Sequence, residues 1–378
     1  MPFVKQLNVT SFRNLHSASF EPCLGINIIQ GENGSGKTSL LEALSVLAHG
    51  RSFRTHKYRR LINHDSTEFT LFALLNGSGD GDPPCKLGIN RSGRGSVAIK
   101  IDGKSVYSAA ELAQRLPLLV MNSSSFQLLE GSSRFRRHFF DWLVFHVKHE
   151  FKEYWKNYAR CVKHRNSLLR RGKISPAEIA PWDAELARLA TKIDTLRAEV
   201  FVLLEAEFNR FLGAFSCAED GKLQLCYEDL KLSYHSGWKA PGENYQDQLS
   251  ENFERDVKLG YTSIGSHKAD IKITLGKVDA VEVLSRGQQK SLIVSLFLAE
   301  ATVFFGCTGR KPVFLLDDLP AELDGSNLSI VGKALTALNA QVFVTAIRAE
   351  AILDNWQYID SGELKMFHVE HGVLSVST

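Results

Sequence analysis

The sequence has few cysteines and no paired-cysteine motif. Its six cysteines are scattered over 378 residues and none belongs to a C-x-x-C pair, so neither a zinc site nor a disulfide framework is indicated. No run approaches the roughly 18 apolar residues of a membrane span, so we expect no membrane contact. The N-terminal residues MPFVKQLN lack the apolar core of a signal peptide, which predicts a cytoplasmic protein.

The bulk composition is that of an ordinary globular protein. Hydrophobic residues make up 44% and charged residues 23%, which is enough apolar material for a sizeable core. The length allows two or three domains. A net charge of +3 indicates little about partners, so the distribution of charge along the chain matters more.

Residues 31–39, GENGSGKTS, match the pattern G-x-x-x-x-G-K-[ST]. An apolar run at 26–29 precedes them and an apolar helical pattern from 40 to 47 follows, so the loop joins a buried strand to a helix N-terminus. Glycines there let backbone N–H groups surround a phosphate. We expect Lys37 to reach the outer phosphates and Thr38 to hold Mg²⁺. The predicted nucleotide-binding residues of this loop are Gly31, Glu32, Asn33, Gly34, Ser35, Gly36, Lys37, Thr38 and Ser39.

Arg13 and Asn14 lie at a turn between two short strand patterns. The turn leads into the strand that carries the phosphate loop. Either these two residues contact the nucleotide, or they form an ordinary polar turn; the sequence leaves both interpretations open.

Residues 51–60, RSFRTHKYRR, contain five Lys/Arg and no acid, with two aromatics interleaved. We call them the basic segment. They are a candidate surface for a nucleic-acid backbone, although a solvated loop would have the same composition. The residues predicted to contact DNA here are Arg51, Arg54, Lys57, Arg59 and Arg60.

The pattern becomes helical from Phe126. Residues 182–203 carry a four-three apolar repeat from Trp182 to Leu203, about three heptads, which predicts an antiparallel helical hairpin. A basic stretch lies at the expected turn, and its predicted DNA contacts are Arg170, Arg171 and Lys173.

The stretch LSRGQQK at 284–290 precedes a long apolar helical pattern. Ser285 and Gly287 can present a hydroxyl and a backbone N–H at the start of that helix, where an anion is favoured. A plain helix N-cap by the serine is the alternative.

Asp317 and Asp318 end an apolar strand that begins at Pro312. The carboxyl ends of such buried strands border the ligand crevice of an α/β sheet. Asp317 therefore suits the acid on the Mg²⁺ side, and Asp318 suits the group that orients or deprotonates a water. Lys37, Asp317 and Asp318 are the predicted catalytic residues, and Thr38 and Asp317 the predicted metal ligands.

Lys37 and Asp317 are separated by 280 positions (317 − 37). A single site containing both requires an α/β domain built from the two ends of the chain. We expect residues 1–125 and 260–378 to form that domain and residues 126–259 to form an inserted helical arm.

Taken together, these motifs resemble the RecF family, recombination mediators of the SMC-like branch of ABC ATPases. The likeness covers nearly the whole chain. Its motifs are Phe12-Arg13-Asn14, the phosphate loop, His49-Gly50-Arg51 with Phe53-Arg54, Arg136-Arg137 with Phe139, Asp141 and Trp142, His267-Lys268-Ala269-Asp270, Leu284 to Gln288, and Asp317-Asp318 with Glu322-Leu323-Asp324.

The resemblance implies an ABC-type head in which two subunits enclose two ATP molecules with Mg²⁺. The residues that would reach the partner's ATP are Ser285, Arg286, Gly287, Gln288 and Asp324. Family members form ATP-dependent homodimers, bind DNA at single-stranded gaps and duplex junctions, and hydrolyse ATP slowly, with DNA stimulation. They act with RecR and RecO to load RecA in DNA repair, replication restart and SOS induction.

Three positions depart from wider patterns. Most ABC ATPases have Glu where this chain, like RecF proteins, has Asp318, and the histidine common near Thr345 is missing. The usual Pro-acid pair of RecF proteins is replaced by Ser123-Ser124, which leaves open whether Ser124 or Gln127 takes the place of the loop acid.

Two other functions share the phosphate loop: the nucleotide-binding subunit of a transporter, and a structural SMC-type protein. A basic helical insertion favours DNA over a transporter. The insertion is too short for the long lever of a structural SMC protein.

Overall fold

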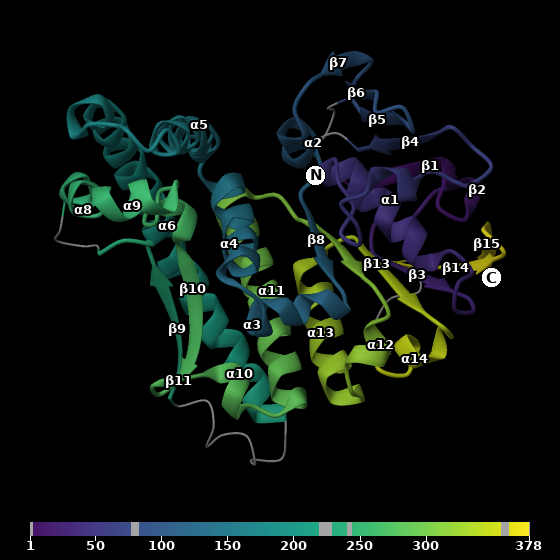
Figure 1. Ribbon diagram of the computed structural model, residues 1–378. Coiled ribbons are helices and arrows are strands. Elements are labelled where there is room, and N and C mark those ends of the chain that lie inside the picture. The colour runs from purple at the N-terminus through teal and green to yellow at the C-terminus, as the bar shows by residue number, and fades with distance from the viewer. Residues whose placement is uncertain (1–2, 77–82, 219–228, 240–243, 357–362, 378) are drawn as a thin grey trace. The chain divides into compact units, whose positions relative to one another are not determined.

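The computed structural model describes residues 3–76, 83–218, 229–239, 244–356 and 363–377 (Figure 1). The chain divides into two compact units. The head unit comprises residues 1–125 and 304–378, and the arm unit comprises residues 126–303.

The second boundary differs from the expected one at residue 259. Strand β10 (Asp270–Leu275) pairs antiparallel with β9 (Leu230–His235) over its whole length. Residues 260–303 therefore belong to the arm unit. Backbone pairing between distant strands places β10 in the arm unit, and no local pattern in the sequence shows it.

The head unit contains two six-stranded sheets with helix α1 (Lys37–His49) between them (Figure 1). One hydrophobic cluster includes side chains from both sheets and α1. The antiparallel sheet has the order β2-β1-β4-β5-β6-β7, formed by Leu15–Phe20, Val4–Phe12, Glu68–Leu75, Cys85–Ser92, Val97–Ile101 and Lys104–Val106. The mixed sheet has the order β15-β14-β3-β13-β12-β8, formed by Val373–Ser377, Leu364–Glu370, Ile26–Gln30, Val342–Ala346, Val313–Leu316 and Leu118–Met121.

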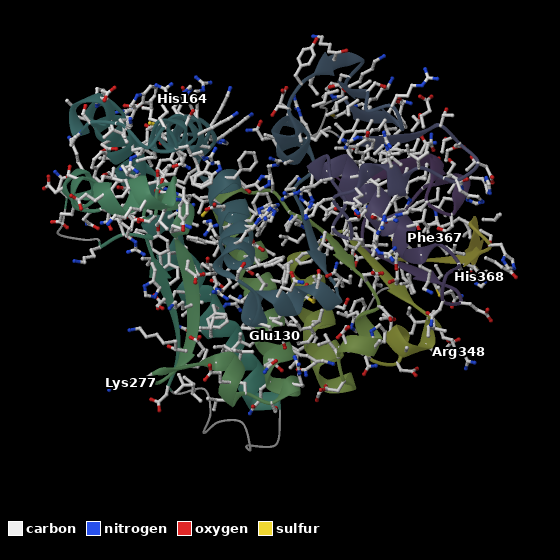
Figure 2. The ribbon with its side chains drawn as sticks, in the orientation of Figure 1. Glu130, His164, Lys277, Arg348, Phe367 and His368 are labelled. Carbon is white, nitrogen blue, oxygen red and sulfur yellow. The ribbon has the colours of Figure 1, made fainter. Side chains whose placement is uncertain are left out.

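Strands β8, β12, β13, β3 and β14 of the mixed sheet are parallel, and β15 is antiparallel to β14. Every residue of β12 and β13 is buried, which explains why their sequences are apolar except for Thr345. Further out, Phe367 of β14 is buried against Phe20, at a ring distance of 5.0 Å, whereas the neighbouring His368 is partly exposed (Figure 2).

The remaining helices of the head unit are short or lie at its C-terminal part. They are α2 (Ala109–Arg115), α12 (Leu319–Glu322), α13 (Gly325–Leu338), α14 (Glu350–Leu353) and the 3₁₀ helices Tyr58–Leu61 and Ser123–Phe126.

The arm unit is mainly helical, as predicted. Helices α5 (Phe151–Leu169) and α6 (Pro176–Ala218) form the hairpin. The other elements are α3 (Gln127–Glu130), α4 (Ser133–Val147), α8 (Tyr245–Glu251), α9 (Phe253–Leu259), the 3₁₀ helix Ser266–Lys268, β11 (Val278–Asp279), α10 (Ala280–Val283) and α11 (Arg286–Thr308), whose last residues enter the head unit.

The apolar stripe of α6 departs from the predicted repeat at its end. Leu186, Ile193 and Val200 are buried, but Leu203 is 44% exposed and Leu204 is fully buried. A straight helix has 3.6 residues per turn, so a repeat of 3.5 drifts away from the packed face within a few turns.

Helix α11 is long and apolar enough to cross a membrane by length and composition alone, the one such helix among the described residues. The sequence did not predict a helix that could cross a membrane, because polar residues such as Ser295 and Glu300 interrupt the apolar run of α11. Of its most apolar 18-residue window, 72% is buried, and core helices pass the same test.

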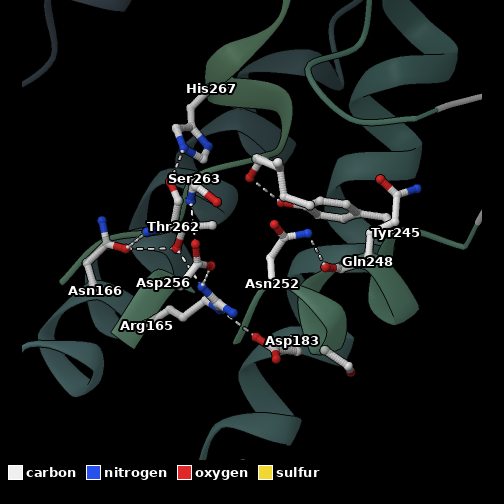
Figure 3. Close-up of polar contacts among 12 residues, drawn as sticks. Arg165, Asn166, Asp183, Tyr245, Gln248, Asn252, Asp256, Thr262, Ser263 and His267 are labelled. Atoms are coloured by element: carbon white, nitrogen blue, oxygen red, sulfur yellow. Dashed lines mark hydrogen bonds and ion pairs between the residues drawn. The ribbon is translucent and has the colours of Figure 1, made fainter. Parts of the chain in front are cut away.

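A buried polar network joins the arm helices to the segment before β10 (Figure 3). The Arg165 guanidinium is fully buried and donates to Asp183 and Asp256, both at 2.6 Å, and to the Thr262 hydroxyl at 3.1 Å. A buried charge is stable only with such partners. The network therefore fixes α5, α6 and α9 around the segment that leads to His267.

Candidate functional site

The phosphate loop has the local geometry that its sequence predicts. Strand β3 ends at Gln30 and helix α1 begins at Lys37. Gly31 has φ +150° and Gly36 has φ +125°, and a Cβ on Gly31 would lie 2.3 Å from the Val369 carbonyl oxygen. Among the described residues no side chain caps the N-terminus of α1. Its first N–H groups therefore remain available to an anion.

Lys37 is 7% exposed and lies within the loop. Its Nζ donates to the carbonyl oxygens of Gly31, at 2.7 Å, and Glu32, at 2.8 Å. Burial lowers the pKa of Lys37, and the charges of Asp318 and Asp317 oppose that shift. The ammonium thus lies between the loop that would cradle phosphates and the two strand-ending carboxylates.

Thr38 and Asp317 meet directly across the two halves of the head unit. The Thr38 hydroxyl donates to Asp317 Oδ1 at 2.8 Å, and the Thr345 hydroxyl donates to the same oxygen at 2.9 Å. Burial raises the pKa of Asp317, while these two hydroxyls and the charge of Arg54 oppose the shift. A hydroxyl and a carboxylate at this distance are the oxygen ligands that Mg²⁺ prefers.

Asp318 occupies a strained backbone position at the same edge. Its φ is +54°, in the left-handed region, and its N–H donates to the Thr345 hydroxyl at 2.8 Å. Its side chain is exposed. Left-handed residues other than glycine persist only where the surroundings hold them, and they gather at functional sites.

The turn at Arg13 and Asn14 braces the phosphate loop. Asn14 Nδ2 donates to the Gly34 carbonyl at 2.9 Å, and the Ser39 hydroxyl donates to Asn14 Oδ1 at 2.7 Å. Arg13 forms a bidentate ion pair with Glu42 at 2.8 and 2.7 Å. A direct contact of either residue with a nucleotide stays a prediction.

Glu42 was missed by sequence reasoning. It is fully buried on α1 and accepts from Arg13 and from the hydroxyl of Ser52. The available signal was an acid inside an otherwise apolar helical stretch, LLEAL, since buried acids are rare unless paired.

The basic segment presents most of its charge to solvent. Arg51, Lys57, Arg59 and Arg60 are exposed, and the Arg54 side chain is 50% exposed, 3.9 Å from Glu42. The guanidinium of Arg91 lies 4.1 Å above the Tyr58 ring, which adds a cation that sequence reasoning missed. At the hairpin turn of the arm unit, Arg170, Arg171 and Lys173 are exposed.

Residues 284–290, which we call the signature stretch, form a helix N-cap, one of the two interpretations that the sequence left open. The Ser285 N–H donates to Gln288 Oε1 at 2.8 Å, and the Gln288 N–H donates to the Ser285 hydroxyl at 3.4 Å, a reciprocal capping box. Arg286 pairs with Glu130 of α3, which Figure 2 labels. A Cβ on Gly287 would meet no described atom within 4 Å, so this backbone is accessible. A contact of Ser285 or Gly287 with the nucleotide of a second copy of the chain stays a prediction.

Asp324 and Ser124 have local partners. Asp324 caps α13 by accepting from the Asn327 N–H at 2.9 Å. Ser124 donates its hydroxyl to Asn122 Oδ1 at 2.6 Å, and Gln127 is exposed. Their roles at an interface or in place of the loop acid are not tested by these contacts.

Comparison with known proteins agrees with this geometry. The family model described as the RecF/RecN/SMC N terminal domain matches residues 3–373. The mixed sheet, the phosphate loop and the paired aspartates define the class, an ABC-type ATPase head. The chain belongs to the RecF family within that class.

The relatives are similar over their full lengths. The DNA replication and repair protein RecF of Teredinibacter turnerae is 58% identical, covering 98% of this chain and 96% of that protein. RecF of Saccharophagus degradans is 49% identical over 100% of both. A solved structure of the recombination mediator protein RecF-ATPrS in the RecFOR pathway has a TM-score of 0.83 at 25% identity, covering 100% of this chain and 98% of that one. An SMC head domain from Pyrococcus furiosus shares the fold, with a TM-score of 0.59 at 14% identity.

Proposed function

We propose that this protein is an ATP-dependent, DNA-binding recombination mediator of the RecF type. The observation that carries the proposal is the hydrogen bond between Thr38 and Asp317, beside Lys37, in a chain of this family. Relatives are named as DNA replication and repair proteins, and solved RecF structures are described with ATP or ATPrS in the RecFOR pathway.

The residues of the head unit fit a nucleoside triphosphate with Mg²⁺. The uncapped N-terminus of α1 and Lys37 would hold the phosphates. Thr38 and Asp317 would hold Mg²⁺, which neutralises phosphate charge when bound. Asp318 would accept a hydrogen bond from the attacking water and orient it. Its short side chain is compatible with a slow, DNA-stimulated ATPase that acts as a switch.

A second copy of the chain would complete the site. Ser285, Gly287 and their neighbours would meet the ATP of the partner copy, so ATP would hold a homodimer together and its hydrolysis would release it. The exposed basic segment and the hairpin turn with Arg170, Arg171 and Lys173, which we call the arm tip, would contact DNA phosphates without reading bases. Such a dimer would act at gapped DNA, with RecR and RecO, to promote RecA loading.

The proposal is tested by sizing the protein with ATP, with ADP and without nucleotide, each with and without gapped DNA. We expect a dimer with ATP and a monomer in the other two states, and tighter DNA binding by the dimer. A monomer in every state, with DNA affinity that ignores the nucleotide, would overturn the proposal.

A further inference from the structure

The buried carboxylate of Glu42 connects the phosphate loop, which precedes it in the sequence, with the basic segment, which follows it. Glu42 lies one helical turn after Thr38 on α1 and is 0% exposed. Its oxygens accept from Arg13 Nε at 2.8 Å, from Arg13 Nη2 at 2.7 Å and from the Ser52 hydroxyl. A fully buried carboxylate needs such partners, so the three side chains hold one another in place.

Both ends of the basic segment are hydrogen-bonded to the ion pair of Arg13 and Glu42. At its start, the Ser52 hydroxyl bonds Glu42 and also accepts from the N–H groups of Arg54, at 2.9 Å, and Thr55, at 3.0 Å. Just past its end, the Arg13 N–H donates to the Leu61 carbonyl at 2.8 Å. Between these two attachments Lys57, Arg59 and Arg60 are exposed, and the half-exposed Arg54 lies 3.9 Å from Glu42.

The same pair is attached to the phosphate loop. Arg13 is followed directly by Asn14, which holds the Gly34 carbonyl. Arg13 itself has φ +55°, a backbone position that persists for a non-glycine residue only where its surroundings fix it. A shift of the phosphate loop therefore acts on Asn14, then on Arg13 and Glu42, and through them on both ends of the basic segment.

We propose that Glu42 is a positioning residue through which a nucleotide in the phosphate loop sets the conformation of the basic segment, and hence the affinity of the protein for DNA phosphates. This inference rests on the proposed function. Glu42 acts through Arg13 and Ser52 and contacts neither the nucleotide nor the DNA.

The test is Glu42→Gln, which keeps the size of the side chain and removes its charge. Binding of a fluorescent duplex is measured with ATPγS and with ADP, and nucleotide affinity is measured separately. Both DNA affinities are measured with the nucleotide at a saturating concentration, so a change in nucleotide affinity does not enter the comparison. We expect the ratio of the two DNA affinities to fall by about fivefold or more, the usual size of such coupling. Glu68→Gln, at an exposed position of β4, is the matched control and retains the wild-type ratio.

A purely structural role for Glu42 would lower DNA affinity equally with both nucleotides and leave the ratio intact, which would overturn the inference. If wild-type DNA affinity does not depend on nucleotide, the proposed function fails together with the inference. If Glu42→Gln does not fold, Ser52→Ala replaces it, because it removes the hydroxyl that joins Glu42 to the start of the basic segment. If folded Ser52→Ala keeps the wild-type ratio of DNA affinity with ATPγS to DNA affinity with ADP, the inference is contradicted.

Discussion

Thr38 and Asp317 are 279 positions apart in the chain, and the hydroxyl of one donates to the carboxylate of the other at 2.8 Å. The contact lies at the carboxyl end of β12, beside the N-terminus of α1. Two segments from opposite ends of the sequence therefore supply one set of oxygen atoms next to the phosphate loop.

Replacing Asp317 by Asn tests the role of this carboxylate. The amide keeps the shape but removes the charge that would face Mg²⁺. We expect ATP turnover, measured as phosphate release, to fall by at least about a hundredfold, as for other groups that stabilise charge at a reacting centre. Asp65→Asn, at an exposed position of the same unit, is the control. Wild-type turnover in Asp317→Asn would remove Asp317 from the site.

Much of this site could be predicted from the sequence because its parts are local. The glycines of residues 31–36, the apolar strand before them and the helical pattern after them specify the loop without help from distant residues. The apolar run ending at Asp317 likewise identifies a core strand and its exposed end.

The parts that could not be predicted depend on contacts between distant residues. The arm unit extends to residue 303, and the pairing of β10 with β9 is one of the distant contacts that place residues beyond 259 in it. The partners of Glu42 come from two other segments, and nothing near LLEAL in the sequence identifies them. Leu204, and not Leu203 as the repeat predicts, lies on the buried face of α6. The helix has 3.6 residues per turn, so its buried face gradually moves away from the positions of a seven-residue repeat.

Ser285→Arg tests whether the signature stretch faces a second copy of the chain. A long charged side chain at this exposed position would block the close approach of a partner. We expect the ATP-dependent dimer to be lost in sizing experiments, while the monomer still binds ATP.

Ser175→Arg is a matched control for that substitution. Ser175 also precedes a helix, and its N–H and its hydroxyl both donate to Glu178 Oε2 at 2.8 Å. Both substitutions place a long charged side chain before a helix and remove a serine that pairs with the side chain three residues on, but only Ser285→Arg alters the signature stretch. Normal dimers of Ser285→Arg, or equal loss of dimers in both variants, would contradict the proposed interface.

The basic segment and the arm tip can be compared by variants that remove equal charge. One variant carries Lys57→Gln, Arg59→Gln and Arg60→Gln, and the other carries Arg170→Gln, Arg171→Gln and Lys173→Gln. Each lost phosphate contact reduces the slope of log affinity against log salt by about 0.9. We expect the first variant to lose ATP-dependent DNA affinity and slope. Unchanged affinity and slope in either variant would exclude that surface from the DNA interface.

His267 makes the stability of the arm unit depend on pH. Its Nε2 lies 3.0 Å from the Thr262 carbonyl (Figure 3). A carbonyl only accepts, so this nitrogen carries the proton, and Nδ1 accepts from the Tyr158 hydroxyl at 2.8 Å. The neutral ring thus satisfies both partners. Burial lowers the pKa of His267 from 6.5 to about 4, against the opposing effect of the Thr262 bond.

Because the unfolded chain binds this proton near pH 6.5 and the folded chain only near pH 4, unfolding takes up a proton between these values. The free energy of unfolding should therefore be unaffected by His267 above about pH 7 and decrease as the pH falls toward 4, by on the order of 3 kcal/mol in total. Urea unfolding followed by tryptophan fluorescence measures this, since four of the five tryptophans lie in the arm unit. We expect His267→Gln to flatten the decrease, whereas His16→Gln, at an exposed position of β2, leaves it in place. An equally steep decrease in His267→Gln would show that another group takes up the proton.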